Sequence, residues 1–556
     1  MLKMYPKTTI FVAKKIVTMN PSNPEGTHVA VREGKILGVG TLDEVKGWGD
    51  YELDETFKEK VILPGFVEVH AHTWEGVTGL YPYQGYFDRT APDGRILKGI
   101  PSIDALLENL RLLDSQLTDP NEAIVTMGFD PIYFPGFILN KTFLDSVSAT
   151  RPIFILHANG HVATVNSAML KKHNIAKDNP IEGLVKGDDG ELTGELQEAP
   201  AMALVESVFM PFMKAVSSEN SLCRFGDMAR QVGVTTMGEL AGAVLTMPAT
   251  LPVWEKAVNE PKFPARICIY NWPTVPGSTA NWGEVAQTIK NLQTEHSTDK
   301  LRFPGVKIVI DGSIQGWTAV MNWPGYYTGK DYGLLLTVPA QFKDWLMPFH
   351  KAGLNIQCHC NGDKAIDLFL ETVEAMLIEV PWLDHRHTVQ HCQLTNQAQF
   401  RKMKALGVCA NIFTNHIWYW GDAHYELTVG PERANRMEPC GTAKRIGVPF
   451  SLHSDANVTP LGSLHLMWCA VNRVTPKGRV LGEHEKISAY DALWAVTQDA
   501  AYQMHMDHEI GSIECGKFAD FAVLDESPLD IDPMKIKDIR VWGTVVGGVK
   551  YQATTV

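Results

Sequence analysis

The sequence of 556 residues contains no run approaching the roughly 20 consecutive apolar residues of a membrane-spanning helix. It also lacks a basic excess, because its formal net charge is −13, which argues against nucleic acid as a partner. Near its start, the short apolar run at 9–13 ends at Lys14 and Lys15, so it indicates a first strand and not a signal peptide. These absences exclude a membrane or nucleic-acid partner and favour a small-molecule substrate.

Cysteine is sparse and its pattern is irregular. The nine cysteines are scattered through the chain, and their odd number without a dense framework favours reduced thiols and a cytoplasmic protein. Apolar residues make up 45% of the chain, which is ample for a folded core.

Two histidines one residue apart close the apolar run at 63–72. Side chains alternate along a strand, so His70 and His72 share one face and can reach one ion. With 19 histidines, such a pair is expected by chance about 0.65 times. A second pair, His385 and His387, lies in a polar stretch, so the context must decide.

Further candidate ligands stand where later strand-like runs stop. The run at 305–313 contains Lys307 and resembles a buried parallel strand, and the strand that ends at His359 is followed by an amphipathic helix predicted over 363–380. His391 ends the run at 387–391, and Asp455 ends the run at 448–455. Ligands at strand ends are what a (β/α)8 TIM-type barrel assembles at its carboxyl face. Imidazole and carboxylate ligands make zinc the first expectation for the metal.

Each of these residues alone has a simpler interpretation. A single buried histidine such as His359 is usually a hydrogen-bonded core residue, and a strand lysine such as Lys307 more often faces solvent. Asp455 alone is equally typical of a turn or a helix cap. Their order along one barrel pattern favours the metal site.

The chain resembles the amidohydrolase superfamily. Within this superfamily it resembles the family 3 branch, whose members are similar to N-substituted formamide deformylases and related amide hydrolases. The resemblance rests on segments throughout the chain. They are VILPGFVEVHAH (61–72), HVATVNSAML (161–170), GELTGELQEA (190–199), VKIVIDGSIQG (306–316), the segments around His359 and His391, LHSDANVTP (452–460) and GSIECGKFADFAVLD (511–525).

The resemblance implies a binuclear metal site. It implies that His70, His72 and Asp455 hold one ion and that His359 and His391 hold the second. Lys307 would bridge the two ions as an N-carboxylated lysine, because a free ammonium would repel them whereas its carbamate is an anionic oxygen ligand.

Three neighbouring residues depart from the expected pattern or have open roles. Glu239 stands where many relatives have aspartate. It is expected to be either a group that orients a metal ligand or an extra ligand. Gln390 replaces a common glutamate, and we expect it to affect the orientation of His391. His453 is expected to contact substrate or to pack.

The expected function is hydrolysis of a non-peptide, amide-type carbon–nitrogen bond by hydroxide on the metal. Asp455 is the expected proton shuttle, with His391 as a second catalytic residue that helps to stabilise the oxyanion. The alternative is a heterocycle deaminase with one metal. Such deaminases usually carry a glutamate three residues after the barrel histidine, whereas Gly362 follows His359 at that spacing, and Lys307 also argues against them. A non-enzymatic scaffold is a third class, disfavoured because all six ligands are present.

The expected fold class is α/β, with three parts. The family resemblance implies that residues 1–62 and 511–556 form a composite β-sandwich beside a barrel over 63–510, with an inserted subdomain. Since the chain is longer than one barrel of roughly 250 residues, insertions are expected around 73–120 and 160–230. Strand-like runs near 124–127, 153–157, 234–238 and 266–270 exceed the two strands that the barrel needs there, and the sequence does not separate them.

Aromatic residues cluster near the predicted strand ends. The segment 73–100 follows His72 directly and is predicted to be a lid or pocket wall. The candidate substrate contacts are Trp74, His161, Trp317 and Trp418, although packing of loops onto the barrel is the favoured explanation for each aromatic residue taken singly. Together they favour a substrate with an apolar or aromatic moiety. Other barrel enzymes of this kind are often oligomers, so a homo-oligomer is an expectation that rests on analogy alone.

Overall fold

The computed structural model describes residues 7–554 except 182, 274–280 and 330–332. The chain divides into two compact units, one formed by Met1–His72 with Gly226–Thr554 and one by Thr73–Phe225. The first unit contains the predicted barrel and a sheet built from both chain ends.

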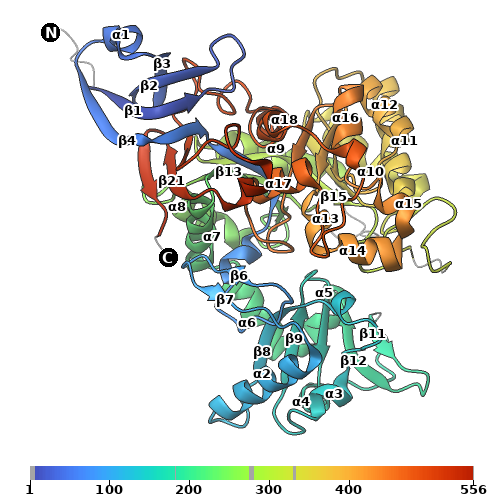
Figure 1. Cartoon of the computed structure of the whole chain (residues 1–556). Helices are drawn as coiled ribbons and strands as arrows, with labels where there is room; N and C mark the ends of the chain where they lie inside the picture. Colours follow the sequence, from blue (N-terminus) through green and yellow to red (C-terminus); the bar gives the residue numbers. More distant parts are fainter. Residues whose placement is uncertain (1–6, 182, 274–280, 330–332, 555–556) are drawn as a thin grey trace. The chain divides into compact units, whose positions relative to one another are not determined.

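The barrel is a sheet of eight parallel strands in the order β19-β18-β17-β16-β15-β14-β13-β5 (Figure 1). A bridge between Ala71 and Ala456 brings its two edge strands together, so the barrel is nearly closed and the predicted fold class is confirmed. The strands are β5 (Phe66–Ala71), β13 (Val234–Gly242), β14 (Arg266–Asn271), β15 (Leu301–Val309), β16 (Asn355–Cys360), β17 (Thr388–His391), β18 (Cys409–Ile412) and β19 (Phe450–Leu452).

Helices follow the barrel strands along the chain. The amphipathic helix predicted over 363–380 is α11 (Asp363–Glu379), which buries Phe369, Leu370 and Val373. The others are α8 (Leu251–Asn259), α9 (Trp282–Glu295), α10 (Pro339–Lys351), α12 (Gln397–Leu406), α13 (Asn415–Tyr419), α14 (Gly421–Ala423), α15 (Gly430–Ala434), α16 (Cys440–Ile446), α17 (Ser463–Asn472), α18 (Ala489–Ala495) and α19 (Gln498–Gln503).

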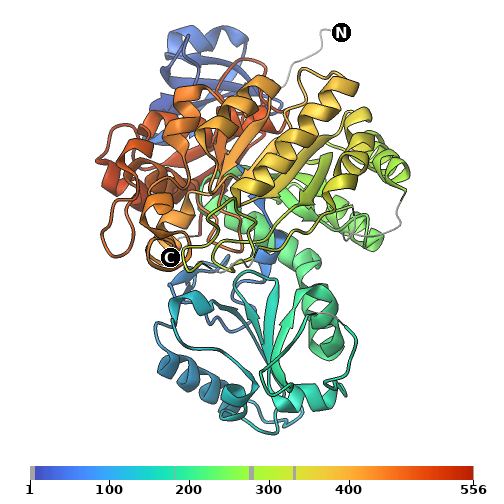
Figure 2. The ribbon, with the colours of Figure 1, turned by 90° about the vertical axis from the view of Figure 1, so that its right-hand side faces the viewer.

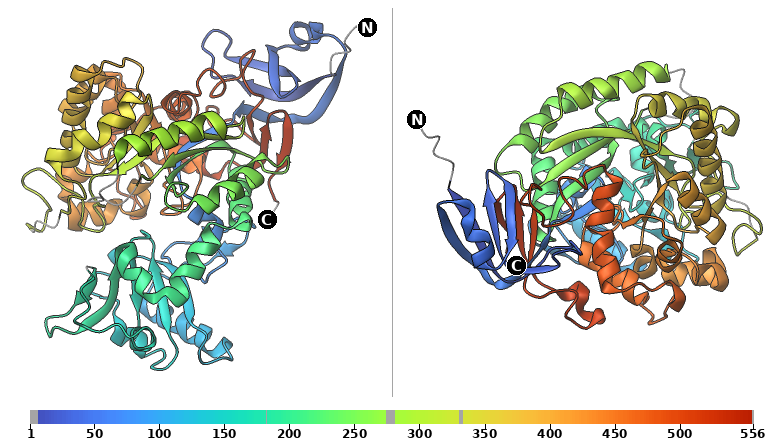
Figure 3. Two further views of the ribbon diagram at one scale, coloured as in Figure 1. Left: turned by 180° about the vertical axis from the view of Figure 1, so that it is seen from behind. Right: turned by 90° about the horizontal axis from the view of Figure 1, so that it is seen from above.

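The two ends of the chain pair in one seven-stranded sheet, in which blue N-terminal strands and dark red C-terminal strands lie side by side (Figure 3). β4 and β20 join the two ends in antiparallel register, and Phe11, Phe57 and Phe521 share the core of this sheet. The strands are β1 (Thr8–Val17), β2 (Glu25–Arg32), β3 (Lys35–Gly40), β4 (Tyr51–Pro64), β20 (Phe521–Leu524), β21 (Val541–Val546) and β22 (Val549–Gln552), with α1 (Leu42–Val45) after β3.

The second unit has a five-stranded sheet in the order β11-β12-β10-β9-β8. Successive residues of β9 face opposite sides: Ile155 packs in one apolar cluster with α2, and Phe154 in another with α6. The two helices therefore cover opposite faces of the sheet (Figure 2). Its elements are α2 (Ile103–Gln116), β8 (Ile124–Phe129), α3 (Lys141–Asp145), β9 (Ile153–His157), β10 (Val162–Val165), α4 (Ser167–Lys172), β11 (Leu184–Lys186), β12 (Leu192–Gln197), α5 (Glu198–Met202) and α6 (Glu206–Val216), and α7 (Glu219–Gln231) leads on to β13.

The structure assigns each strand-like run that the sequence left ambiguous to one of the two units. The runs near 124–127 and 153–157 are β8 and β9 of the second unit, whereas those near 234–238 and 266–270 are the barrel strands β13 and β14. The second unit includes residues between the two insertions expected at 73–120 and 160–230. The boundaries of the predicted domains stay a prediction.

Two further findings concern the cysteines and the search for membrane-spanning helices. None of the nine cysteines, all of which lie within the described residues, forms a disulfide, and seven of them are buried. Within the described residues, no single helix is long and apolar enough to cross a membrane, and one bent pair, Pro200–Val216 with Glu219–Gln231, passes that test by length and composition alone.

Candidate metal centre

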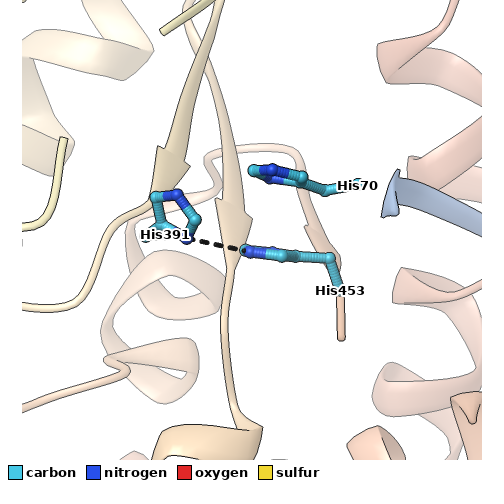
Figure 4. A group of neighbouring side chains, drawn as sticks. All are labelled: His70, His391 and His453. Atoms are coloured by element: carbon cyan, nitrogen blue, oxygen red, sulfur yellow. Dashed lines mark hydrogen bonds between the residues drawn. The ribbon is translucent and has the colours of Figure 1, made fainter. Parts of the chain in front are cut away.

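The polar side chains at the carboxyl ends of the barrel strands lie together. β5 supplies His70 and leads into His72, while β17 ends at His391. His453 and Asp455 follow β19 directly. Figure 4 shows the imidazoles of His70, His391 and His453 turned toward one another.

One group of three ligand atoms centres on a carboxylate oxygen. The Nε2 atoms of His70 and His72 lie 3.3 and 3.1 Å from Oδ1 of Asp455. All three residues offer ligand atoms within 4.8 Å of one another. Among the described residues, Oδ1 of Asp455 is buried and has no hydrogen-bond partner.

The hydrogen bonds of the two imidazoles indicate what this group binds. Nδ1 of His70 lies 2.8 Å from Oε1 of Gln390, and Nδ1 of His72 lies 3.2 Å from Oε1 of Glu239. Each Nδ1 therefore donates, so whenever the ring is neutral its Nε2 turns a lone pair toward an oxygen of Asp455. Lone pairs that face one another in a buried site require a cation between them, so these residues fit a divalent metal ion.

Lys307 lies beside this group. Its Nζ donates to Nε2 of His70 over 3.0 Å, and the side chain is buried. Burial lowers the pKa of Lys307 to about 8. A strand lysine facing solvent, the simpler interpretation of the sequence, is therefore wrong here.

His391 lies between two further histidines of the site, His359 and His453. Its Nε2 lies 2.9 Å from Nδ1 of His359, and its Nδ1 lies 3.1 Å from Nε2 of His453. His70, His391 and His453 form the second group of ligand atoms within 4.8 Å of one another. The expected pairing of His359 with His391 is thus present as a contact, while a second ion there stays a prediction.

The backbone holds two of these side chains in an unusual conformation. His391 and Asp455 have φ angles of +74° and +50°, in the left-handed region that non-glycine residues rarely adopt. The buried Glu68 accepts hydrogen bonds from the backbone N–H of Ser454 at 3.1 Å and from its hydroxyl at 2.7 Å. These bonds tie β5 to the turn that carries Asp455.

Charge and burial compete at His72. Burial lowers the pKa of His72, but contacts with Asp455 and Glu239 outweigh it and raise the pKa to about 9. In the absence of a metal, a proton thus takes the place of the cation that the two carboxylates attract.

Glu239 and Gln390, whose roles the sequence left open, both orient ligands. Glu239 contacts His72, as an orienting group would. The expectation that Gln390 orients His391 is wrong, because the hydrogen bonds of its side chain go to His70, Gln357 and Asn411.

The predicted substrate residues do not gather in one described place. Trp418 packs on Trp468 with ring centroids 5.3 Å apart, and Trp317 packs on the apolar cluster that includes Ile314. Trp74 and His161 belong to the second unit, where Trp74 packs on Phe212 and His161 pairs with Glu198. Their role in substrate binding stays a prediction.

Two residues of the site were not predicted as ligands or supports. His453 was expected only to contact substrate or to pack, although strand alternation from Ser451 could have placed it inside the barrel. Asp311 is buried and accepts hydrogen bonds from the backbone of Gly362 at 2.8 Å and Asn361 at 3.0 Å. Its carboxylate lies 3.8 Å from Nε2 of His359, so it anchors the loop beside that histidine.

Comparisons with known proteins agree with this site. The family model described as the amidohydrolase family matches residues 58–550. The chain is 28% identical to protein LONG AFTER FAR-RED 3 of Arabidopsis thaliana over 96% of this chain and 89% of that protein. It is 24% identical to N-substituted formamide deformylase of Arthrobacter pascens over 98% of both chains.

Solved structures show the same fold. An uncharacterized metal-dependent hydrolase from Pyrococcus horikoshii superposes with a TM-score of 0.69 at 20% identity, over 95% of this chain and 99% of that one. The family match covers most of the chain, including every strand of the barrel and all six predicted ligands. The chain therefore belongs to the amidohydrolase family and is an enzyme that hydrolyses carbon–nitrogen bonds other than peptide bonds.

Proposed function

We propose that this enzyme hydrolyses the amide bond of a small molecule at a binuclear metal site, with Asp455 as the proton shuttle. The observation that carries the proposal is the convergence of the Nε2 atoms of His70 and His72 on Oδ1 of Asp455, with Lys307 within 3.0 Å of His70. We further propose that the ions are zinc and that the protein is cytoplasmic.

Six side chains would hold the ions. His70, His72 and Asp455 would hold one ion, and His359 with His391 would hold the other, with Lys307 shared between them. A bound divalent ion would polarise the substrate carbonyl and make a water molecule acidic enough to attack it at neutral pH.

In this reaction Asp455 would carry one proton from the attacking water to the departing nitrogen. As the water oxygen forms its bond to the carbonyl carbon, Asp455 accepts the proton that the water releases. When the carbon–nitrogen bond breaks, Asp455 donates this proton to the departing nitrogen, so an amine and a carboxylic acid leave. We propose that His391, whose Nδ1 lies 3.8 Å from Oδ2 of Asp455, would donate to the developing oxyanion.

Lys307 is proposed to carry a carboxyl group on Nζ. A buried ammonium beside two dications would be strongly repelled, whereas the carbamate formed with carbon dioxide is an anionic ligand with two oxygens. Native mass spectrometry of the intact enzyme should show the added mass of carbon dioxide. The added mass should disappear in Lys307→Arg, and a bare lysine in an active, metal-loaded enzyme would remove this part of the proposal.

We propose that the substrate has an apolar or aromatic moiety, on the strength of the aromatic residues that follow β15 and β18, among them Trp317 and Trp418. Paired aryl and small aliphatic amides with the same leaving group test this proposal. A clear preference for small charged amides would contradict it.

Amide hydrolysis is favoured over heterocycle deamination by one contact. Deaminases of related barrels use one metal, whereas Lys307, whose Nζ lies 3.0 Å from Nε2 of the ligand His70, would as a carbamate be a ligand that two ions can share. Elemental analysis of protein purified without chelator separates the two. Two equivalents of metal support the amide hydrolase, and one equivalent with ammonia released from heterocycles supports the deaminase.

The role of Asp455 is tested by Asp455→Asn. The variant should keep most of its metal, because His70 and His72 remain, but lose turnover by orders of magnitude, because an amide cannot carry the proton. Asp499→Asn is the matched control. Asp499 is a partly buried aspartate of α19 that accepts hydrogen bonds from the backbone of Phe450 and from Trp494, away from the metal ligands. Near-normal turnover in Asp455→Asn would end its role as shuttle.

A further inference from the structure

A chain of side-chain hydrogen bonds runs inside the barrel from the metal centre toward the opposite end of the strands. It starts at the metal ligand His70, passes through Gln390 and Gln357, and ends at Asn355, the first residue of β16. Gln390, Gln357 and Asn355, here called the amide chain, are all buried. Each amide has one end that only donates and one that only accepts, so such a chain has a direction.

The direction is fixed at Asn355. Its Nδ2 donates to the backbone carbonyl oxygens of His385 at 3.0 Å and Arg386 at 2.8 Å. Backbone carbonyls only accept, so the nitrogen of Asn355 must face them and Oδ1 must face Gln357. Reversing the side chain would place an oxygen against two oxygens and lose two hydrogen bonds, at about 1–3 kcal/mol for each buried group left unpaired.

The next two amides transmit this direction to the site. Because Oδ1 of Asn355 accepts, Nε2 of Gln357 donates to it, and Oε1 of Gln357 then accepts from Nε2 of Gln390. Oε1 of Gln390 is therefore the atom that faces Nδ1 of His70, at 2.8 Å.

A second branch agrees with the same direction. Nδ2 of Asn411 donates to Oε1 of Gln390 over 2.8 Å, while Oδ1 of Asn411 accepts from the hydroxyl of Ser451 over 2.9 Å. The branch through Gln357 requires oxygen, not nitrogen, at this end of Gln390, and the branch through Asn411 is compatible with it, since the Ser451 hydroxyl can donate or accept. Nδ1 of His70 must therefore carry a proton, which leaves the lone pair of Nε2 to accept from Nζ of Lys307 at 3.0 Å.

We propose that the backbone carbonyls of His385 and Arg386 set the tautomer of the metal ligand His70 through the amide chain. Asn355, Gln357 and Gln390 are thus positioning residues for a ligand that only Gln390 touches. The value of this tautomer for metal binding rests on the proposed function, but the tautomer itself does not. Outer contacts of this kind typically change metal affinity by about 10–100-fold.

Two substitutions of Asn355 separate the effect of the direction of the amide chain on His70 from the effect of the substitution on the stability of the protein. Asn355→Leu removes the acceptor that orients Gln357, whereas Asn355→Asp keeps an acceptor for Gln357 while losing the donor to the two carbonyls. Asn472→Leu is the matched control, since Nδ2 of Asn472 also donates to two backbone carbonyls, those of Trp468 and Pro533, at 3.0 and 2.9 Å. All three variants should be less stable than the wild type.

The first measurement is the 15N spectrum of histidine-labelled protein, before and after removal of metal, with the His70 signals assigned by their loss in His70→Gln. The wild type, Asn355→Asp and Asn472→Leu should show Nδ1–H, and Asn355→Leu should show a mixture of both tautomers. Nε2–H at His70 in the metal-free wild type, or Nδ1–H alone in Asn355→Leu, would overturn the proposal.

Zinc affinity, measured by competition with a chelator, gives the second readout. Asn355→Leu should bind zinc about 10–100-fold more weakly, and Asn355→Asp and Asn472→Leu should bind it nearly as the wild type does. If Asn355→Leu does not fold, Gln390→Met cuts the amide chain next to His70 and should give the same two changes. A wild type that binds no zinc refutes the proposed function, while the nitrogen spectra still decide the tautomer.

Discussion

The chain contains two histidine pairs of the same spacing, and the structure gives them opposite environments. His70 and His72 lie at the carboxyl end of β5, while His385 and His387 lie just before the amino end of β17. Of the four side chains, three are buried and His72 is partly exposed. The sequence motif is identical, so the difference comes from what the ring nitrogens face.

At the second pair, hydrogen-bond partners account for every ring nitrogen. His385 accepts from the backbone N–H of His387 at 2.8 Å and faces the carbonyl of Leu406 with its other nitrogen at 2.7 Å. His387 accepts from the backbone of Ile356 at 3.1 Å and donates to His350 at 2.9 Å. Neutral rings satisfy this network completely.

At the first pair, the partners leave a deficit of positive charge. Each Nδ1 donates to an acceptor, and each Nε2 faces the carboxylate of Asp455. An H-x-H pair therefore predicts a metal site only where its ring nitrogens converge on further ligands. The carboxyl ends of parallel strands provide that convergence, because ligands from several strands meet there.

The largest expected effect separates the two pairs by mutation. His72→Ala should lose bound metal and reduce turnover by about 1,000-fold or more. His387→Ala should keep its metal but lower the free energy of unfolding by about 3 kcal/mol, because Ile356 and His350 lose buried partners. Metal analysis and denaturant unfolding of both variants check this. Loss of metal in a fully folded His387→Ala variant would mean that the second histidine pair also supports the metal centre.

The order of the predicted ligands along the barrel followed from strand ends alone, because a parallel barrel gathers those ends at one face. His70, His72, His391 and Asp455 lie together for that reason. The helix predicted at 363–380 was also recognisable, since α11 buries one apolar face against the barrel.

Other features depended on three-dimensional packing. Periodicity could not distinguish β8 and β9 of the inserted unit from the barrel strands β13 and β14, because all four are short buried strands. The ligand that Gln390 contacts was misjudged, because it is not the adjacent His391 but His70, which lies 320 residues earlier in the chain. No local pattern encodes such a contact.

The second expected effect is a dependence of stability on pH. Burial, together with the neighbouring His385 and His350, holds the pKa of His387 well below its ordinary value of 6.5. The stability that His387 contributes is therefore present above pH 6.5 and is lost as the pH falls below it, because only the unfolded chain then binds the proton. The expected slope is about 1.4 kcal/mol per pH unit for this histidine.

Denaturant unfolding of metal-free protein between pH 5 and 8 measures this slope. His387→Gln, whose amide oxygen can still accept from the backbone of Ile356, should show a slope smaller by one proton. Equal slopes in the wild type and in His387→Gln would mean that the second pair is not held neutral, and the contrast between the two pairs would then weaken.

The smallest expected effect concerns the charge behind His72. In Glu239→Gln the amide oxygen can still accept from Nδ1 of His72 and from the backbone of Ala241, which contact Oε1 of Glu239 at 3.2 and 2.7 Å. The tautomer is then kept, but the imidazole loses the carboxylate that makes it more basic. Zinc affinity should fall by about 10-fold, whereas Glu239→Leu, which removes the acceptor as well, should lower it by about 100-fold.

This pair of variants separates orientation from charge at the metal centre. Chelator competition at one pH measures both affinities, and the stability of the metal-free proteins serves as the control. If Glu239→Gln binds zinc as weakly as Glu239→Leu, the carboxylate charge and not the direction of the hydrogen bond governs His72. Because the partner of His70 is the neutral Gln390, the two ligands of one strand would then be supported by different physical means, one by charge and one by the direction of an amide.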